Sequence, residues 1–168
     1  MSQLDSNWSF VDDSKVKPPK GFLFAGISAG LKASNKKDLA LILAPEGSIF
    51  SGMFTQSIVR ASCVDICEER IKTTSGCLRA ILINSGQANA CTGNLGIQHF
   101  QIATGKIAEL LGIKEQEVLM CSTGVIGVPI QINDLVRNLP NLVSDLKGNN
   151  FQNAAEAILT TDLTLKKV

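Results

Sequence analysis

The sequence has few aromatic residues and little net charge. Its 168 residues contain no tyrosine and one tryptophan, so it lacks the stacking surfaces that binders of single-stranded nucleic acid use. Proteins that bind nucleic acid or an anionic membrane are typically strongly positive, whereas the formal net charge here is +1. We therefore predict neither partner. Charged residues make up 18% of the chain, below the usual ~25%. Either a well-filled core or a surface that meets another chain accounts for this low fraction.

Residues that hold metals or act as nucleophiles are also scarce. The only close pair of cysteines is Cys63 and Cys67, and a single histidine, His99, could complete a site. We therefore predict no metal and interpret these two thiols as small buried side chains. Cys91 and Cys121 lie in segments of apolar or small residues, and the sequence shows no neighbouring group that would lower the pKa of either thiol. No phosphate-binding G-x-x-x-x-G-K-[ST] loop and no GxSxG elbow is present.

Targeting signals are absent from the sequence as given. Acidic residues interrupt the first 20 positions, no apolar core follows the start, and no run is long enough to span a membrane. The five cysteines are an odd number, which indicates reduced thiols. We predict a cytoplasmic protein.

The pattern of apolar residues predicts one α/β domain over residues 21–168, preceded by a polar N-terminal arm at 1–20. The expected sheet is mixed and partly antiparallel, and it is packed with helices. Segments 38–44 and 48–55 predict an antiparallel pair joined by Pro45-Glu46-Gly47. Segments 78–86 and 118–121 predict two buried strands that end in polar, glycine-containing turns, which could lie side by side. Segment 59–66 fits either a short strand or the start of a helix.

Four helices are predicted in the second half of the chain and near its end. Asn94 to Gly112 has apolar residues at intervals of three and four, with a good cap at each end. We expect a short helix at 133–138 that Pro140 stops, and another over 141–147. A last helix, predicted over 150–159, delivers Thr160-Thr161-Asp162. His99 lies within the first of these helices, where a histidine is more often a surface or satisfied side chain than a catalyst.

The candidate chemistry lies at Ser122-Thr123-Gly124, where the last apolar strand ends. A turn of this composition can point backbone N–H groups and a hydroxyl into the space beyond the strand, which suits a developing oxyanion. A plain structural turn explains the same residues. The amides of Asn84, Gln87 and Asn89 could either face a ligand or, as we favour, fix their own loop.

Several motifs, in their order and spacing, resemble those of the ornithine acetyltransferase family of arginine biosynthesis, the glutamate N-acetyltransferases. The resemblance covers nearly all of the chain, with departures at Gln56, Ser57 and Gln87. The motifs are Gly21-Phe22 with Ala25-Gly26 and Ala29-Gly30-Leu31-Lys32, Asp38 to Ile42, Gly52 to Thr55, Asn84 to Gly93, Ser122 to Gly127, and Thr160-Thr161-Asp162.

The resemblance implies a layered α/β sandwich of the self-processing type. It also implies that Thr123 and Gly124 form the oxyanion hole and that Thr160 or Thr161 contacts the substrate. The nucleophile is a threonine that self-cleavage frees at the start of a β chain. It takes acetyl from N-acetylornithine and passes it to glutamate, without metal or cofactor; in bifunctional members acetyl-CoA is a further acetyl donor.

The resemblance also implies assembly into two α and two β chains. The family's Lys-Gly-Ser-Gly-Met segment and the cleavage site are missing here. We therefore expect these residues to be most of an α chain, incomplete at its C-terminus and inactive alone. Two alternatives stay open: a related self-processing aminopeptidase, and a ligand-binding or assembly domain without chemistry.

Overall fold

The structure is a computed structural model that describes residues 16–162 and residue 165. Its centre is a four-stranded sheet in the order β1-β2-β3-β4. Strand β2 pairs antiparallel with β1 and with β3, whereas β3 and β4 run parallel. The predicted mixed, partly antiparallel sheet is confirmed. The strands are β1 (Leu23–Ile27), β2 (Leu39–Leu43), β3 (Ala80–Gln87) and β4 (Val118–Val125).

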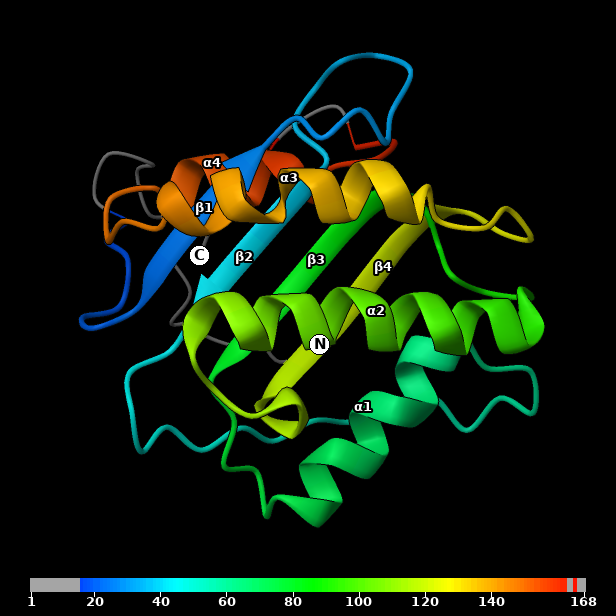
Figure 1. Cartoon of the computed structure of the whole chain (residues 1–168), viewed down its shortest axis with the longest axis horizontal. Coiled ribbons are helices and arrows are strands. Elements are labelled where there is room, and N and C mark those ends of the chain that lie inside the picture. The colour runs from blue at the N-terminus through cyan, green and yellow to red at the C-terminus, as the bar shows by residue number, and fades with distance from the viewer. Residues whose placement is uncertain (1–15, 163–164, 166–168) are drawn as a thin grey trace, which may run out of the picture.

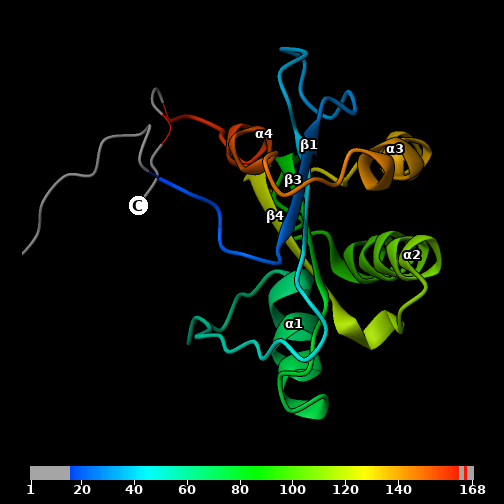
Figure 2. The ribbon, with the colours of Figure 1, turned by 90° about the vertical axis from the view of Figure 1, so that its left-hand side faces the viewer.

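Helices cover both faces of this sheet (Figure 1). In the edge-on view of Figure 2, α2 and α3 lie on one side and α4 on the other, with α1 beside the lower part of β4. The helices are α1 (Ser62–Thr73), α2 (Gly93–Leu111), the short 3-10 helix η2 (Glu115–Glu117), α3 (Ile132–Ser144) and α4 (Phe151–Ala157). Within residues 16–162, none of them is long and apolar enough to cross a membrane.

The apolar run of β2 is explained by burial on both of its faces. Leu39 and Leu41 belong to the larger core cluster, which lies under α2 and α3. Ala40, between them, belongs to the smaller cluster under α4, with Phe24 and Ala154. Successive side chains of a strand point to opposite faces, so a strand between two helical layers must be apolar at every position.

Helix α2 matches its sequence pattern closely. Phe100, Ala103 and Ile107 are fully buried, and the helix ends at Gly112, whose left-handed backbone (φ 65°) caps it. The ambiguous segment 59–66 is resolved as helical, because α1 begins at Ser62. The last helix, α4, begins after Asn150 as expected and ends at Ala157. Of the predicted arm, residues 1–15 lie outside the described part of the chain.

The strand predicted over 48–55 is wrong. Only Ile49 makes a bridge, to Cys77, and Phe50 N donates to Gly76 O over 2.8 Å. Both edges of β2 are already paired with β1 and β3, so no position beside β2 remains for this segment. Phe50 and Phe54 pack against the core, whereas Ile49 is 69% and Met53 is 100% exposed.

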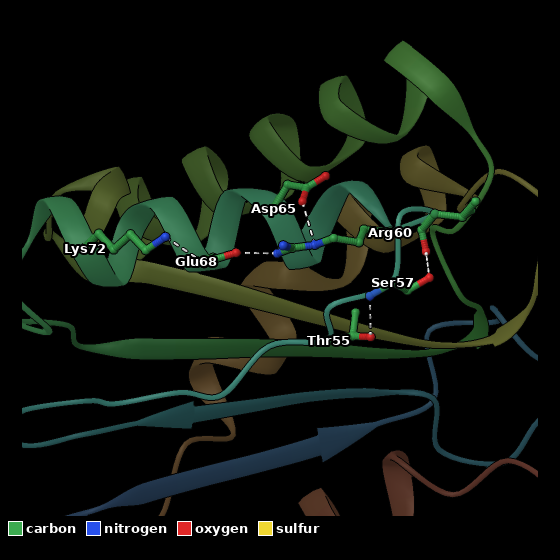
Figure 3. Close-up of polar contacts among 7 residues, drawn as sticks. Thr55, Ser57, Arg60, Asp65, Glu68 and Lys72 are labelled. Carbon is green, nitrogen blue, oxygen red and sulfur yellow. Dashed lines mark hydrogen bonds and ion pairs between the residues drawn. The ribbon is translucent and has the colours of Figure 1, made fainter.

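An arginine attaches the end of this irregular segment to α1, as Figure 3 shows. Arg60 Nε lies 2.8 Å from Asp65 Oδ1, and a terminal nitrogen of Arg60 contacts Glu68 Oε2 at 2.5 Å. Lys72 binds the other oxygen of Glu68 at 2.6 Å. The hydrogen bond from Lys72, followed by that from Arg60, lowers the pKa of Glu68. Glu68 thus joins Arg60 to the last turn of the helix.

The predicted helix stop at Pro140 is also wrong. Helix α3 runs through Pro140 to Ser144 and merges the two short helices expected at 133–138 and 141–147. An interior proline costs a helix about 3 kcal/mol. Leu135, Leu139 and Leu142 are all fully buried on one side of α3, and each contributes about 1.5–3 kcal/mol. Packing therefore outweighs the local preference.

Candidate functional site

The site lies where β3 and β4 end side by side, at the edge of the sheet that is uppermost in Figure 1. The expected proximity of these two ends is confirmed, since Ser85 is paired with Thr123 and Gly86 with Gly124. The predicted end of the last strand is corrected, however. Strand β4 continues to Val125, because its parallel partner continues to Gln87 and keeps the backbone extended.

The paired glycines bring two backbones unusually close. Gly86 has φ 127° and Gly124 has φ 133°, a conformation that side chains rarely adopt. A Cβ atom on Gly124 would lie 2.3 Å from the carbonyl carbon of Gly86. Neither glycine therefore places a side chain of its own over the peptide groups at this point of the sheet.

A cavity of about 500 Å³ opens over these strand ends, and we name it the threonine cleft. It brings together the four site residues that the family resemblance implies. Thr123 and Gly124 come from β4, and Thr160 and Thr161 follow α4. The cleft is lined by Lys32, Ser34, Gly86, Thr123, Gly124, Val125, Thr160 and Thr161.

The direction of the strand limits which donors Thr123 and Gly124 offer. Val125 O accepts a hydrogen bond from Ala88 N at 2.9 Å, on the β3 side. Because backbone groups alternate in direction along a strand, the amide of Thr123 also points toward β3 and that of Gly124 points away. The two amides cannot converge on one oxygen. The Thr123 hydroxyl and the Gly124 amide remain as the pair of donors at the cleft.

The loop 28–37 forms one wall of the cleft and is held by a carboxylate. Asp38 is fully buried, and its oxygens accept hydrogen bonds from the amides of Ala29 (2.7 Å), Leu31 (2.7 Å) and Lys32 (2.9 Å). Gln87 Nε2 donates to Leu31 O at 2.9 Å and ties the same loop to β3. Asp38 thus supplies the acceptors for a loop that has no regular secondary structure.

The segment after α4 also lines the cleft, through Thr160 and Thr161. Ser85 Oγ donates to Ala157 O, and Lys32 Nζ donates to Leu159 O. Ala157 O is one of the last carbonyls of α4, which have no intrahelical donor, and Leu159 O lies two residues beyond the end of the helix. These bonds place Thr160 and Thr161 against β4. A second cavity, of about 550 Å³, shares Lys32, Ser34 and Thr160 with the threonine cleft.

The side-chain amides singled out in the sequence are internal, as favoured. Asn84 Nδ2 donates to Gln87 O at 2.9 Å, and Asn89 Nδ2 donates to Gly96 O at 3.1 Å. Gln87 bonds Leu31, as described above. All three side chains are buried, and they shape the connection between β3 and α2.

The thiols and the histidine lie away from the threonine cleft. Cys63, Cys67 and Cys121 line a separate cavity of about 160 Å³. Burial raises the pKa of all three thiols, and it raises that of Cys67 to about 12, so none is an activated nucleophile. His99 is buried on α2, and burial lowers its pKa. Over the described part of the chain, no group of three or more His, Cys, Asp or Glu residues is placed to hold a metal ion.

Sequence reasoning missed Asp38 and Lys32 as parts of the site. The apolar pattern predicts Asp38 as the first residue of a strand, although an acidic residue at the start of a fully apolar run is itself a signal. A carboxylate buried at such a position needs donors, and a nearby loop rich in glycine and small residues supplies them as free amides. Lys32 gives no comparable signal, since its partners lie at Lys37 and near residue 159.

Comparisons with known proteins agree with one another. Residues 23–168 match the model of the ArgJ family. The chain is 75% identical over 158 residues to the "Arginine biosynthesis bifunctional protein ArgJ" of Prochlorococcus marinus subsp. pastoris, covering 94% of this chain and 39% of that protein. It is 45% identical over 156 residues to the protein of the same name from Caldanaerobacter subterraneus subsp. tengcongensis, covering 93% of this chain and 38% of the relative.

Two solved structures resemble the fold described above. One is an ornithine acetyltransferase complexed with ornithine from Mycobacterium tuberculosis, with TM-score 0.83 and 36% identity, covering 87% of this chain and 79% of that chain. The other is an arginine biosynthesis bifunctional protein from Bacillus halodurans, with TM-score 0.81 and 33% identity, covering 86% and 75%. The chain spans about 39% of the length of the first curated relative that it matches.

Proposed function

The chain belongs to the ArgJ family, and on this basis we propose that it is the α-chain part of a glutamate N-acetyltransferase. The enzyme would move acetyl from N-acetylornithine to glutamate in arginine biosynthesis. The observation that carries the proposal is the threonine cleft, because it gathers Thr123, Gly124, Thr160 and Thr161 from distant parts of the chain into one cavity.

In the proposed reaction, a threonine at the start of a β chain attacks the acetyl carbonyl carbon of N-acetylornithine. Its own terminal amine takes the hydroxyl proton. The carbonyl oxygen becomes an oxyanion, which the Thr123 hydroxyl and the Gly124 amide would bind. The C–N bond then breaks, the proton passes to the leaving nitrogen, and ornithine departs from an acetyl-threonine ester. The amine of glutamate attacks this ester and regenerates the threonine.

The chemistry of the described residues supports a nucleophile from another chain. The three thiols near β4 are held protonated, since burial raises their pKa values. Ser122 is adjacent to Thr123, but its hydroxyl oxygen is buried. The cleft thus offers donors for an oxyanion and hydroxyls for a substrate, and the attacking group would enter from the β chain. We propose that this chain alone does not transfer acetyl.

The other partners follow from the same proposal. The amino-acid part of the substrate would lie against Thr160 and Thr161. Acetyl-CoA would serve as a second acetyl donor in a bifunctional enzyme, and no metal or resident cofactor is required. Two α and two β chains would form the assembly, which suits the low charged fraction of 18%. We place the reaction in the cytoplasm.

The test uses a chimeric enzyme. This chain replaces the matching region of the Prochlorococcus marinus subsp. pastoris relative, to which it is 75% identical. We expect the chimera to transfer acetyl from N-acetylornithine to glutamate. Thr123→Val should lower kcat by about 100- to 1000-fold, the usual effect of losing one oxyanion donor. Thr73→Val, at an exposed position on α1, is the matched control and should change the rate by less than about twofold.

The outcomes separate the alternatives. Release of amino acids from peptides without acetyl exchange would favour the aminopeptidase. An unchanged rate in Thr123→Val would remove the oxyanion role, and acetyl transfer by the isolated chain would contradict the need for a β chain. Assays with acetyl-CoA in place of N-acetylornithine decide between a monofunctional and a bifunctional enzyme.

A further inference from the structure

The segment that carries Thr160 and Thr161 has no regular structure to hold it. Helix α4 ends at Ala157, and the residues that follow form bends. Within the segment, Leu159 N donates to Glu156 O at 3.3 Å, a long contact. Side chains of other elements also support the segment. Ser85 Oγ binds Ala157 O, and Lys32 Nζ binds Leu159 O, immediately before the threonine pair.

Lys32 is itself fixed at both ends. Its backbone amide donates to Asp38 Oδ2 at 2.9 Å. Its ammonium donates to Lys37 O at 2.9 Å in addition to Leu159 O. An ammonium has three N–H donors, so two of them are used by backbone carbonyls. A cation at the carbonyl end of α4 is also favoured by the helix dipole. Lys32 therefore connects the loop 28–37 to a segment that lies 127 residues away in sequence.

The surroundings of the Lys32 side chain make this connection specific. Burial lowers the pKa of the ammonium, while the charge of Asp38 opposes that effect. The backbone at Gly86 leaves the Lys32 side chain little room to move, because a Cβ atom on Gly86 would lie 2.8 Å from Leu31 O and 3.6 Å from Lys32 Cγ. The end of β3 thus packs against the lysine stem.

We propose that Lys32 is a positioning residue, whose ammonium holds Leu159 O and thereby places Thr160 and Thr161 at the wall of the threonine cleft. This inference rests on the proposed acetyl transfer. It adds that the amino-acid substrate is bound well only while the hydrogen bond from Lys32 Nζ to Leu159 O is formed. A misplacement of about 1 Å in a substrate-positioning group can cost on the order of 100-fold in rate. The effect should appear in KM, because the threonines contact the unreacting part of the substrate.

The experiment compares Lys32→Met and Lys32→Arg with Lys106→Met in the chimeric enzyme. Lys106 is a matched control, since its side chain is 33% exposed and pairs with Glu109 on α2, away from the cleft. Hydrogen exchange of residues 158–162 is measured by mass spectrometry, and KM and kcat are measured with N-acetylornithine. In Lys32→Met we expect exchange at least about 10-fold faster and KM raised about 10-fold or more, with kcat changed less. Arginine should restore both values to within about threefold, since it keeps a charged donor.

Each result decides the matter. Unchanged exchange in Lys32→Met overturns the proposal, as does faster exchange without a change in KM in an active enzyme. An arginine variant as defective as the methionine variant would remove the role of a charged donor, and an equal effect of Lys106→Met would make the defect nonspecific. If the chimera itself transfers no acetyl, the proposed function fails, and the exchange measurement alone then decides whether Lys32 holds residues 158–162.

Discussion

Replacing Asp38 with asparagine should release the loop that lines the threonine cleft. The carboxylate is fully buried and accepts hydrogen bonds from the amides of Ala29, Leu31 and Lys32. Asparagine has nearly the same shape, but one of its two acceptor atoms becomes an NH2 group that can only donate. At least one of these amides would then face a donor and lose its partner.

The magnitude follows from two losses. A buried amide without a partner costs about 1–3 kcal/mol, and the bonds that remain lose the extra strength of an ionised acceptor, about 1 kcal/mol. The sum is about 3 kcal/mol. Since 1.4 kcal/mol corresponds to a factor of ten, the open state of the loop should become about 100-fold more populated. A substitution that preserves volume would thus loosen the wall of the cleft without leaving a cavity in the core.

Hydrogen exchange of residues 28–37 in the assembled chimera measures this opening directly. We expect exchange about 100-fold faster in Asp38→Asn, with a lower kcat/KM for acetyl transfer. Asp134→Asn is the control, because Asp134 forms only a half-exposed ion pair with Arg137 at 3.1 Å, worth less than about 1 kcal/mol. Less than a threefold change in Asp38→Asn, or an equal change in the control, would refute the role given to the carboxylate.

Three further predictions concern the sheet, the histidine and the thiols. Gly124→Ala should lower the stability measured by thermal denaturation by more than about 3 kcal/mol, because the new Cβ would lie 2.3 Å from the neighbouring backbone. Gly127→Ala is the control: Gly127 has φ 78° and open space around it, so this change should cost about 1–2 kcal/mol. Equal losses in the two variants would contradict the close approach of the strands. Burial lowers the pKa of His99 from 6.5, so the unfolded state binds the proton first, and stability should fall as the pH drops through 6.5 toward the folded-state pKa. His99→Gln should remove that part of the pH dependence, and an unaltered profile would exclude His99 as its source. Iodoacetamide at pH 7.5 should modify the exposed Cys77 well before Cys67, whose pKa is about 12; comparable rates by mass spectrometry would show that Cys67 is accessible as a thiolate.

The sequence predicted those elements whose pattern is set by burial alone. The apolar runs of β2, β3 and β4 and the helix α2 are all found where the periodicity placed them. The segment 48–55 has a similar pattern but forms no strand, because β1 and β3 already occupy both edges of β2. Which edges are occupied depends on how distant strands pair. Pro140 has a strong local preference that three buried leucines override. Both errors come from contacts between segments that lie far apart in the sequence.

Four residues that line the candidate cavity were predictable from the sequence, but Lys32, Asp38 and the geometry were not. Resemblance to a family pointed to Thr123, Gly124, Thr160 and Thr161, and the structure brings them into one cavity. Which donors face that cavity depends on the register of β3 and β4, because a shift by one residue would exchange the directions of the Thr123 and Gly124 amides. The local sequence of either strand does not determine this register.

The threonine cleft is held mainly by bonds from side chains to backbone atoms. Asp38 and Gln87 fix the loop 28–37, while Ser85 and Lys32 fix the end of α4. Such bonds set the positions of main-chain segments and leave Thr123, Thr160 and Thr161 at the wall of the cavity. Preorganised donors stabilise a developing charge without reorganising at the moment of reaction. A cleft built in this way should therefore tolerate changes among its lining hydroxyls without loss of folding, whereas replacing the residues that hold the backbone should loosen the cleft.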